Sequence, residues 1–519
     1  MSKFVDARKV VRGIKDHSTI ALTGFGGIGQ CDKVLREIRD SFLRTGHPNN
    51  LTIYHAAGQS DNTNGIEYIA EEGLIRRVIG GHWGLAPKVR KLIEENKIEA
   101  YCFPQGQLTH LFRTIANRLP GQLSPIGIGT FVDPRLDGGK INEKAKASGE
   151  DFVQLLSIGE EEFLFYRSPH FDYVLIRGTT ADEAGNITTE EEPLKLEILS
   201  AAQAAKACGG KVIAQVKYIA QKNSFHPKDV VVPGYLVDEI VVADQPEMEH
   251  RQVPSSVYNP VYCGNLRSPV EVQRPLPLDI RKVIGLRAVK ELKKSSVVNL
   301  GIGIPGDVIG PITVELNLLD DIYLTVESGA VGGIPVGSNE FGLTKNADAI
   351  LDHAYQFDHY HGAGVDLAFM GAAEIDRYGN VNVSKFGGRI VGCGGFMDVT
   401  QPAKEIVFCS TFTNGGLRVA VENGRLIILK EGRNRKFVRD VQHITFSGPY
   451  AASRGKKVTY VTERAVFVLT PEGLELTEIA PGVDLEQDIL YQMDFRPVIK
   501  NVKTMELDVF GESNLFRRQ

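Results

Sequence analysis

A strand followed by a glycine-rich turn occurs twice in this chain, and the repeat constrains the fold more than any other feature. The segments ALTGFGGIG (residues 21–29) and VNLGIGIPG (residues 298–306) each follow a stretch with helical periodicity. When they are aligned, Gly24 falls on Gly301, at the point where each apolar run ends. Glycine at such a point allows the backbone to turn sharply or to approach a ligand closely.

A second match follows the first in the same order. VLIRGTTADEAGNIT (residues 174–188) resembles LAFMGAAEIDRYGNVNV (residues 367–383), with Asp182 and Asn186 aligned with Asp376 and Asn380. Convergent turn chemistry could produce either match alone. Two matches in order predict two copies of one α/β unit with loops of different length.

Short apolar, β-rich runs alternate with segments of helical periodicity, which predicts mostly parallel sheets. The expected strands of the first half are 19–23, 51–56, 100–103, 173–176, 211–216 and 239–243. The expected helices include 87–96, 194–207 and one that carries Val34, Leu35, Ile38, Phe42 and Leu43 on a single face before it stops at Gly46. Near the C-terminus we expect a strand at 458–461, a hairpin at 465–479 and then a helix that starts in PGVDLEQDILYQM, residues 481–493.

The segment between the two copies has a different composition. Six prolines lie between Pro246 and Pro277 in a polar stretch without a clear period, which is typical of a connection between domains. A chain of 519 residues also exceeds what one core usually holds. We therefore predict two related open α/β domains, at 1–260 and 281–519, joined by a linker at 261–280.

Composition excludes several classes of protein. The net charge is −5, from 59 basic and 64 acidic residues, and the nearest approach to a basic run is KEGRNRKFVR at 430–439, so nucleic acid is not an expected partner. Six scattered cysteines without a CxxC pair predict reduced thiols in the cytoplasm. The N-terminus lacks the apolar core of a signal peptide and no apolar run approaches the ~18 residues of a membrane span, so no membrane partner is expected.

Glu327 is the first candidate for chemistry. It lies in TVESGAVGGIP (residues 325–335), directly after an apolar β-rich run that starts at Ile322. Ligands of open α/β sheets bind at the carboxyl ends of the strands, so Glu327 would project into a binding crevice. A carboxylate there could be a base, a metal ligand or a covalent nucleophile. The alternative is an ordinary surface or capping glutamate.

Other motifs are weaker. The turn GFGGIG has the spacing of a dinucleotide fingerprint, but no acidic residue closes the βαβ unit, because Asp40 lies on the helix. The histidines and aspartates between Asp352 and His361 match no compact metal-ligand spacing and are interpreted as polar or hydrogen-bonded residues. Cys393 could be a nucleophile, although a small filler is favoured, and no G-x-S-x-G elbow is present.

Two backbone turns could serve a reaction. Consecutive N–H groups in GCGGFMD (residues 392–398) could form an anion-binding nest or an oxyanion hole. Gln105 ends another expected strand and could hydrogen-bond a carboxylate or a thioester oxygen, or it could be a simple turn residue.

These motifs together resemble the family I coenzyme A-transferases, and most closely the single-chain propionate or acetate (short-chain acyl) CoA-transferases. The resemblance covers essentially the whole chain. It rests on TGFGGIG (23–29), PQGQLTHLFR (104–113), GIGTFVDPR (127–135), IRGTTADEAGNIT (176–188), NLGIGIP (299–305), TVESGAVGG (325–333), GCGGFMD (392–398) and EIAPGVDL (478–485).

The resemblance implies a fused enzyme of two CoA-transferase/NagB-like halves with the active site between them. The family nucleophile, a glutamate in an E-N-G or E-S-G turn, falls on Glu327. Ser328 stands where the two-chain members usually have Asn, and Gln30 stands where the first glycine turn commonly continues into proline. These departures leave the nucleophile in place and the preferred acid open.

The implied reaction transfers CoA between an acyl-CoA and a short-chain acid through a glutamyl-CoA thioester. The candidate oxyanion donors are Gly394, Gly395, Gly26 and Gly27, the candidate substrate-binding residue is Gln105, and the candidates for contacts with CoA are Gly301, Gly303 and Gly394. No metal, no ATP and no cofactor beyond the substrate CoA are expected, and the resemblance favours a homo-oligomer, a dimer or tetramer. The alternatives are a thioester hydrolase on the same scaffold, a nicotinamide-dependent dehydrogenase and a non-catalytic binding protein.

Overall fold

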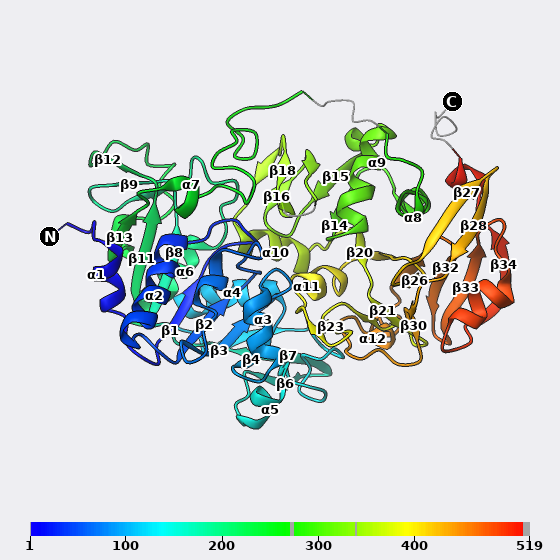
Figure 1. Cartoon of the computed structure of the whole chain (residues 1–519), viewed down its shortest axis with the longest axis horizontal. Coiled ribbons are helices and arrows are strands. Elements are labelled where there is room, and N and C mark those ends of the chain that lie inside the picture. Colours follow the sequence, from blue (N-terminus) through cyan, green and yellow to red (C-terminus); the bar gives the residue numbers. More distant parts are fainter. Residues whose placement is uncertain (1, 270–274, 338–339, 512–519) are drawn as a thin grey trace.

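A computed structural model of the chain describes residues 2–269, 275–337 and 340–511. Within these residues, the first half is built on a seven-stranded sheet whose strands are all parallel, with α1, α2, α3, α4 and α6 packed around it (Figure 1). In spatial order the strands are β13 (Glu239–Val242), β11 (Lys211–Val216), β8 (Tyr173–Arg177), β1 (Thr19–Leu22), β2 (Leu51–His55), β3 (Ile75–Gly80) and β4 (Glu99–Cys102). The helices are α1 (Ala7–Arg12), α2 (Asp32–Thr45), α3 (Pro87–Glu94), α4 (Gln105–Ala116) and α6 (Ile198–Ala207).

The second half is built on a ten-stranded sheet that is parallel at its centre and antiparallel on either side, with the last pair of strands at its C-terminal end parallel again. In spatial order its strands are β19 (Ala349–Ile350), β16 (Ala330–Val331), β15 (Ile322–Thr325), β14 (Ser296–Leu300), β20 (Leu367–Gly371), β25 (Glu405–Cys409), β31 (Lys457–Val461), β32 (Ala465–Thr470), β33 (Gly473–Ile479) and β34 (Val498–Thr504). Its main helices are α8 (Ile280–Ala288), α9 (Gly310–Glu315), α10 (His353–His361), α11 (Phe396–Thr400) and α12 (Gly448–Ser453).

The predicted duplication is confirmed by the topology. Strand β1 lies between β2 and β8, and β14 lies between β15 and β20 in the same sense. The two Asp–Asn turns also match: Asp182 accepts the side-chain amide of Asn186 at 2.9 Å, and Asp376 accepts that of Asn380 at 2.9 Å. The two halves therefore repeat both a strand order and a hydrogen-bonded turn.

The predicted elements of the first half are present with small shifts of their ends. Helix α2 buries Val34, Leu35 and Ile38 against the sheet and ends at Gly46, whose left-handed φ of 76° suits glycine. Leu43 does not share this buried face as predicted: its side chain is 63% exposed, because it lies off the stripe that faces the strands.

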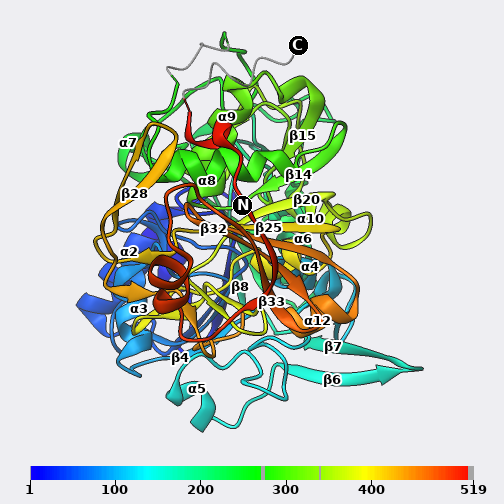
Figure 2. The ribbon, with the colours of Figure 1, turned by 90° about the vertical axis from the view of Figure 1, so that its right-hand side faces the viewer.

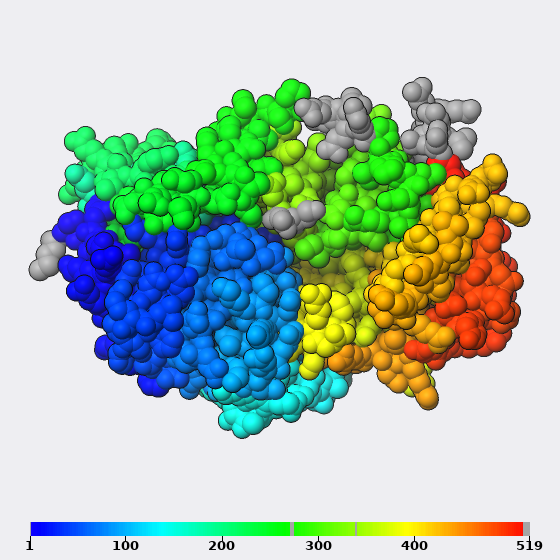
Figure 3. All heavy atoms as spheres, viewed as in Figure 1, coloured from blue at the N-terminus to red at the C-terminus, as the bar shows by residue number. Residues whose placement is uncertain are grey.

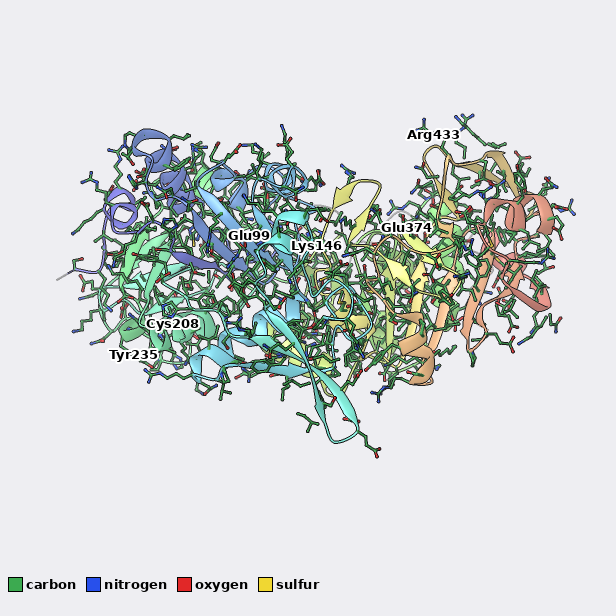
Figure 4. The ribbon with its side chains drawn as sticks, turned by 90° about the horizontal axis from the view of Figure 1, so that it is seen from below. Glu99, Lys146, Cys208, Tyr235, Glu374 and Arg433 are labelled. Atoms are coloured by element: carbon green, nitrogen blue, oxygen red, sulfur yellow. The ribbon has the colours of Figure 1, made fainter. Side chains whose placement is uncertain are left out.

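Two regions differ from the sequence prediction. Residues 485–492 form a short π-helical turn (Leu485–Ile489) and a 3₁₀ turn (Leu490–Gln492) instead of a regular helix. A three-stranded antiparallel sheet of β5 (Gly121–Ser124), β6 (Val153–Ile158) and β7 (Glu161–Arg167) was not predicted. Its hairpin β6–β7 projects away from the body of the molecule (Figures 2 and 4).

The connection between the halves begins after β13 and contains the short helix α7 (Pro246–Glu249). The second half resumes at α8, where the Asp279 side chain accepts from the backbone N–H groups of Arg281 and Lys282. All strands of the first large sheet precede this connection and all strands of the second follow it. The exact domain boundaries stay a prediction.

The two halves share a core. The hydrophobic cluster of the first half includes Leu343, Ile390, Cys393 and Met397 from the second. Helix α4 contacts both α10 and α11 at the centre of the molecule (Figure 1), and α3 contacts strand β24 (Arg389–Ile390), where blue and yellow surfaces meet in Figure 3. Among the described residues, none of the helices has the length and apolar character needed to cross a membrane.

Candidate active site

Glu327 lies just beyond the carboxyl end of β15, as the sequence predicts for a residue facing a crevice. A tight turn follows it: the N–H of Val326 donates to the carbonyl of Ala330, and Gly329 has a φ of 113°. A Cβ atom at Gly329 would lie 2.4 Å from the carbonyl oxygen of Leu351, so only glycine fits. The hydroxyl of Ser328 donates to the carbonyl of Gly342 and thereby fixes the turn.

The Glu327 carboxyl group is only 9% exposed, and its surroundings control its charge. Burial raises its pKa to about 7, because the charged form loses its water shell. Hydrogen bonds from its own backbone N–H and from the Asn299 amide oppose this rise, whereas the charge of Asp398 adds to it. Both the carboxylic acid and the carboxylate are therefore accessible near neutral pH.

Glu327 opens into a cavity of about 160 Å³ at the junction of the two halves. The first half supplies Phe25, Gly26, Gly58, His82, Leu85 and Gln105. The second half supplies Gly301, Ile302, Glu327, Phe341, Met370, Gly371, Val383 and Val391 to Phe396. Neither half could form this cavity alone.

Of the two glycines proposed as donors opposite Glu327, Gly395 fits the role better. A Cβ atom at Gly395 would lie 3.3 Å from Cγ of Glu327, and within the described residues its N–H has no acceptor. The N–H of Gly394 already donates to the carbonyl of Gly81 at 2.8 Å. Gly394 lines the cavity but cannot offer that N–H to a substrate in this conformation, which argues against its predicted role as a donor.

Of the other four candidate glycines, two line the cavity and two do not. Gly26 and Gly301 line the cavity. Gly27 and Gly303 are not among its lining residues, and a Cβ atom at Gly27 would lie 2.4 Å from Cγ of Pro254. Because Gly27 packs against the connecting segment, Gly26 is the better candidate on this side. The proposed contacts of Gly301 and Gly303 with CoA stay predictions.

Gln105 is the first residue of α4 and reaches the cavity, but its amide nitrogen is already engaged. Nε2 of Gln105 lies 2.9 Å from Nε2 of His353, and Nδ1 of His353 lies 2.6 Å from Oε2 of Glu197. Sequence reasoning missed Glu197 altogether and interpreted His353 as one of several polar or hydrogen-bonded residues, without placing it at the site. No local sequence pattern could have revealed this series of hydrogen bonds, because its three residues lie far apart in the sequence.

His82 is a second cavity residue that sequence reasoning missed. Its ring is enclosed by Gly58 and Gly84, whose added Cβ atoms would lie 3.0 Å and 2.7 Å from it. Neither glycine has a positive φ, so space rather than backbone conformation requires glycine there. Burial lowers the pKa of His82 to about 4, and the ring is neutral at neutral pH.

The alternative chemistries find little support in the geometry. Residues 353–361 form helix α10, in which His353 contacts Glu197 and His361 contacts Asp398. In the part of the chain that the structure describes, no group of three or more His, Cys, Asp or Glu side chains could hold a metal ion. Burial raises the pKa of the Cys393 thiol well above its usual range, which disfavours a thiolate.

The GFGGIG turn is used for packing. A Cβ atom at Gly24 would lie 2.6 Å from Gln59, and one at Gly29 would lie 2.4 Å from Leu196. Helix α2 starts at Asp32, whose carboxyl group accepts from the N–H of Gly65 at 2.9 Å. An acidic side chain at this helix start disfavours a pyrophosphate, and with it the dehydrogenase alternative.

Comparisons with known proteins show the family to which the chain belongs. Residues 4–243 match the family model described as Coenzyme A transferase. The chain is 44% identical over 519 residues to caffeate CoA-transferase from Acetobacterium woodii, covering 99% of this chain and 98% of the relative. It is 43% identical over 509 residues to the acetate CoA-transferase YdiF from Escherichia coli K12, covering 98% and 94%.

One solved structure is similar to this chain in both sequence and fold. The acyl-CoA transferase YdiF from Escherichia coli O157:H7, in a thioester complex with CoA, superposes with a TM-score of 0.91 at 42% identity and covers 98% of this chain and 96% of its own. The fold and the site thus define an α/β transferase that is built from two related halves. The chain belongs to the coenzyme A transferase family, and it is a CoA-transferase close to the single-chain acetate CoA-transferases.

Proposed function

We propose that this enzyme transfers CoA between a short-chain acyl-CoA and a carboxylic acid by a ping-pong mechanism through a glutamyl-CoA thioester on Glu327. One observation carries the proposal. A buried carboxyl group with a raised pKa lies against Gly395, whose N–H has no acceptor among the described residues, inside a cavity that both halves line. A nucleophile and an oxyanion donor on opposite sides of one space are the parts that acyl transfer requires.

The reaction has two symmetrical halves. The ionised carboxylate attacks the thioester carbonyl and expels the CoA thiolate, which leaves a mixed anhydride. The thiolate attacks the glutamyl carbonyl of the anhydride, so Glu327 becomes a thioester and the first acid leaves as its carboxylate. The acceptor acid then reverses these steps, attacking the glutamyl thioester and finally taking CoA from the anhydride.

The protein's part is to position these groups and to stabilise charge. Each step passes through a tetrahedral oxyanion, and we propose that the backbone N–H groups of Gly395 and Gly26, two residues that line the cavity, stabilise it. A carboxylate of raised pKa is a better nucleophile than an ordinary one, because it is less stabilised by water. One thioester replaces another, so we propose that no metal and no cofactor beyond CoA takes part.

The proposed substrates are short-chain acids such as acetate and propionate. The named relatives act on acetate and on caffeate, and the cavity wall here is mostly glycine and apolar side chains. Binding energy from the long CoA chain, far from the reacting carbon, can be used to position the thioester. We also propose a cytoplasmic homo-oligomer, a dimer or tetramer, which sedimentation and cell fractionation would test.

The decisive experiment is detection of the covalent intermediate. Incubation with acetyl-CoA, without an acceptor, should convert Glu327 into its CoA thioester with release of acetate. The mass gain of CoA minus water is detected by intact mass and located by peptide mapping after borohydride or hydroxylamine trapping. Glu327→Gln should abolish both the adduct and transfer. Asp32→Asn is the matched control, because Asp32 is a buried carboxyl group whose pKa burial also raises to about 7, but it does not line the cavity.

Transfer without an adduct would refute the mechanism. The same experiment separates transfer from thioester hydrolysis, since a hydrolase would consume acetyl-CoA at the same rate with and without propionate. We expect release of acetate beyond one equivalent only when propionate is present, with propionyl-CoA as the second product.

A further inference from the structure

Three buried side chains form a hydrogen-bonded chain that ends in the active-site cavity. Glu197 precedes α6, His353 begins α10 and Gln105 begins α4, so both halves of the molecule contribute. The Glu197–His353 contact is 2.6 Å and the His353–Gln105 contact is 2.9 Å. Glu197 and His353 are fully buried, and of the three side chains Gln105 alone lines the cavity.

The chemistry of these groups fixes where their hydrogens lie. A carboxylate only accepts, so the close contact with Glu197 places a hydrogen on Nδ1 of His353. The other oxygen of Glu197, Oε1, has no donor among the described residues, so this ring N–H is the partner on which the buried carboxylate depends. The amide nitrogen of Gln105 can only donate, so its contact of 2.9 Å with Nε2 of His353 requires that ring nitrogen to accept from it.

It follows that Gln105 turns its carbonyl oxygen, Oε1, away from the ring and toward the cavity. Gly394 lies on that side: a Cβ atom there would lie 3.8 Å from Oε1. Among the residues that the structure describes, nothing donates to Oε1. The cavity therefore contains a hydrogen-bond acceptor of fixed orientation, whereas the neutral His82 ring on the same wall can either donate or accept.

We propose that Glu197 and His353 are positioning residues that hold Gln105 with Oε1 toward the substrate, so that the enzyme selects acyl groups carrying a hydrogen-bond donor over those carrying an acceptor. A hydroxy acid would satisfy Oε1, while the keto acid of the same length would set two acceptors against each other. The inference rests on the proposed transfer through Glu327. Sites that hydrogen-bond a substrate hydroxyl discriminate strongly against analogues without it.

The test compares acids that differ only in this group. With acetyl-CoA as donor, kcat/KM is measured for lactate, pyruvate and propionate, and for 3-hydroxybutyrate, acetoacetate and butyrate. We expect the hydroxy acid to exceed the keto acid by at least about tenfold in one series. A ratio near one in both series overturns the inference, and so does a preference for the keto acids, which would mean that the amide is reversed.

Variants test the positioning role. Gln105→Met removes the acceptor and His353→Phe removes its support, and both should bring the hydroxy/keto ratio to within about threefold of one. If His353→Phe leaves the ratio unchanged, positioning is refuted. If Gln105→Met lowers kcat/KM equally for all six acids, Gln105 contacts CoA or supports the fold, and the selectivity claim fails.

The chain offers a matched control in its first half. Gln215, His250 and Glu192 form a similar buried series, with contacts of 3.3 Å and 3.1 Å, that does not line the cavity. Gln215→Met and His250→Phe should lower stability by a similar amount without changing the ratio. The glutamyl-CoA adduct is measured in every variant, because its absence from the wild type would refute the proposed function, whereas its presence with an unaltered ratio refutes only this inference.

Discussion

In the proposed reaction Glu327 must be both buried and able to ionise, and its surroundings meet both needs. Burial disfavours the carboxylate, while hydrogen bonds from its own backbone N–H and from the Asn299 amide partly restore it, so that the pKa is about 7. A deeper site would keep the group protonated, and an exposed one would leave it well solvated and a weak nucleophile. The residue thus works near its own pKa.

This balance predicts a pH dependence. The carboxylate attacks and the carboxylic acid does not, so kcat/KM for acetyl-CoA should rise as pH passes upward through about 7. Between pH 6 and pH 8 the ionised fraction of a group with this pKa grows about tenfold, and the rate should follow it. Initial rates under kcat/KM conditions measure the profile.

The control alters a neighbouring charge. The Asp398 carboxylate raises the pKa of Glu327, so Asp398→Asn should move the acid limb of the profile to lower pH. A flat profile between pH 6 and pH 8 in the wild type would contradict a raised pKa.

At the scale of elements, the site depends on the turn that precedes α11. This turn carries Gly395 against Glu327 and connects to the first half, since the N–H of Gln105 donates to the carbonyl of Gly394 at 2.9 Å. Gly395 has a φ of −83°, which any residue can adopt, whereas Gly394 has a left-handed φ of 53°. The two glycines are therefore required for different reasons.

Alanine substitution should separate these reasons. In Gly395→Ala the new Cβ atom would lie 3.3–3.5 Å from Glu327, crowding the nucleophile and the approaching carbonyl, so we expect kcat to fall at least about tenfold with little change in Tm. Gly394→Ala should instead lower stability by about 1 kcal/mol, with a smaller loss of kcat. Thermal melts and steady-state kinetics measure both, and a larger loss of Tm than of kcat in Gly395→Ala would contradict this assignment.

The sequence predicted the elements that local patterns encode, and it failed where distant contacts decide. Strand ends followed by glycine turns placed Glu327 and Gly26 at the cavity, because the carboxyl ends of parallel strands meet at one edge, and the glycine-rich turn GCGGFMD made Gly395 a candidate for the same site. The orientation of the Gln105 amide was not predictable, since it depends on His353 and Glu197 from other helices. Likewise, no local signal shows that the N–H of Gly394 is already bonded.

At the scale of the whole molecule, the cavity exists only while the halves stay docked, and Asp398 is central to their contact. This fully buried carboxyl group on α11 accepts from the backbone N–H of Gly106 at 2.9 Å and the side chain of Gln107 at 3.2 Å, both on α4 of the first half. His361 lies 3.0 Å from it within the second half. One side chain thus joins three groups from two helices to α11.

Removing this carboxyl group should uncouple the halves. Asp398→Ala leaves buried donors on α4 unpaired, which costs about 1–3 kcal/mol for each, so we expect a marked fall in Tm together with loss of transfer. The control is Arg113→Ala, which also breaks a contact between the halves, the ion pair with Asp358, but one whose side chains are 41% and 45% exposed. Such a pair contributes about 1 kcal/mol or less, so this variant should keep its Tm within a few degrees and retain activity. If Asp398→Ala melts like the control and still forms the glutamyl-CoA adduct, Asp398 does not hold the halves together.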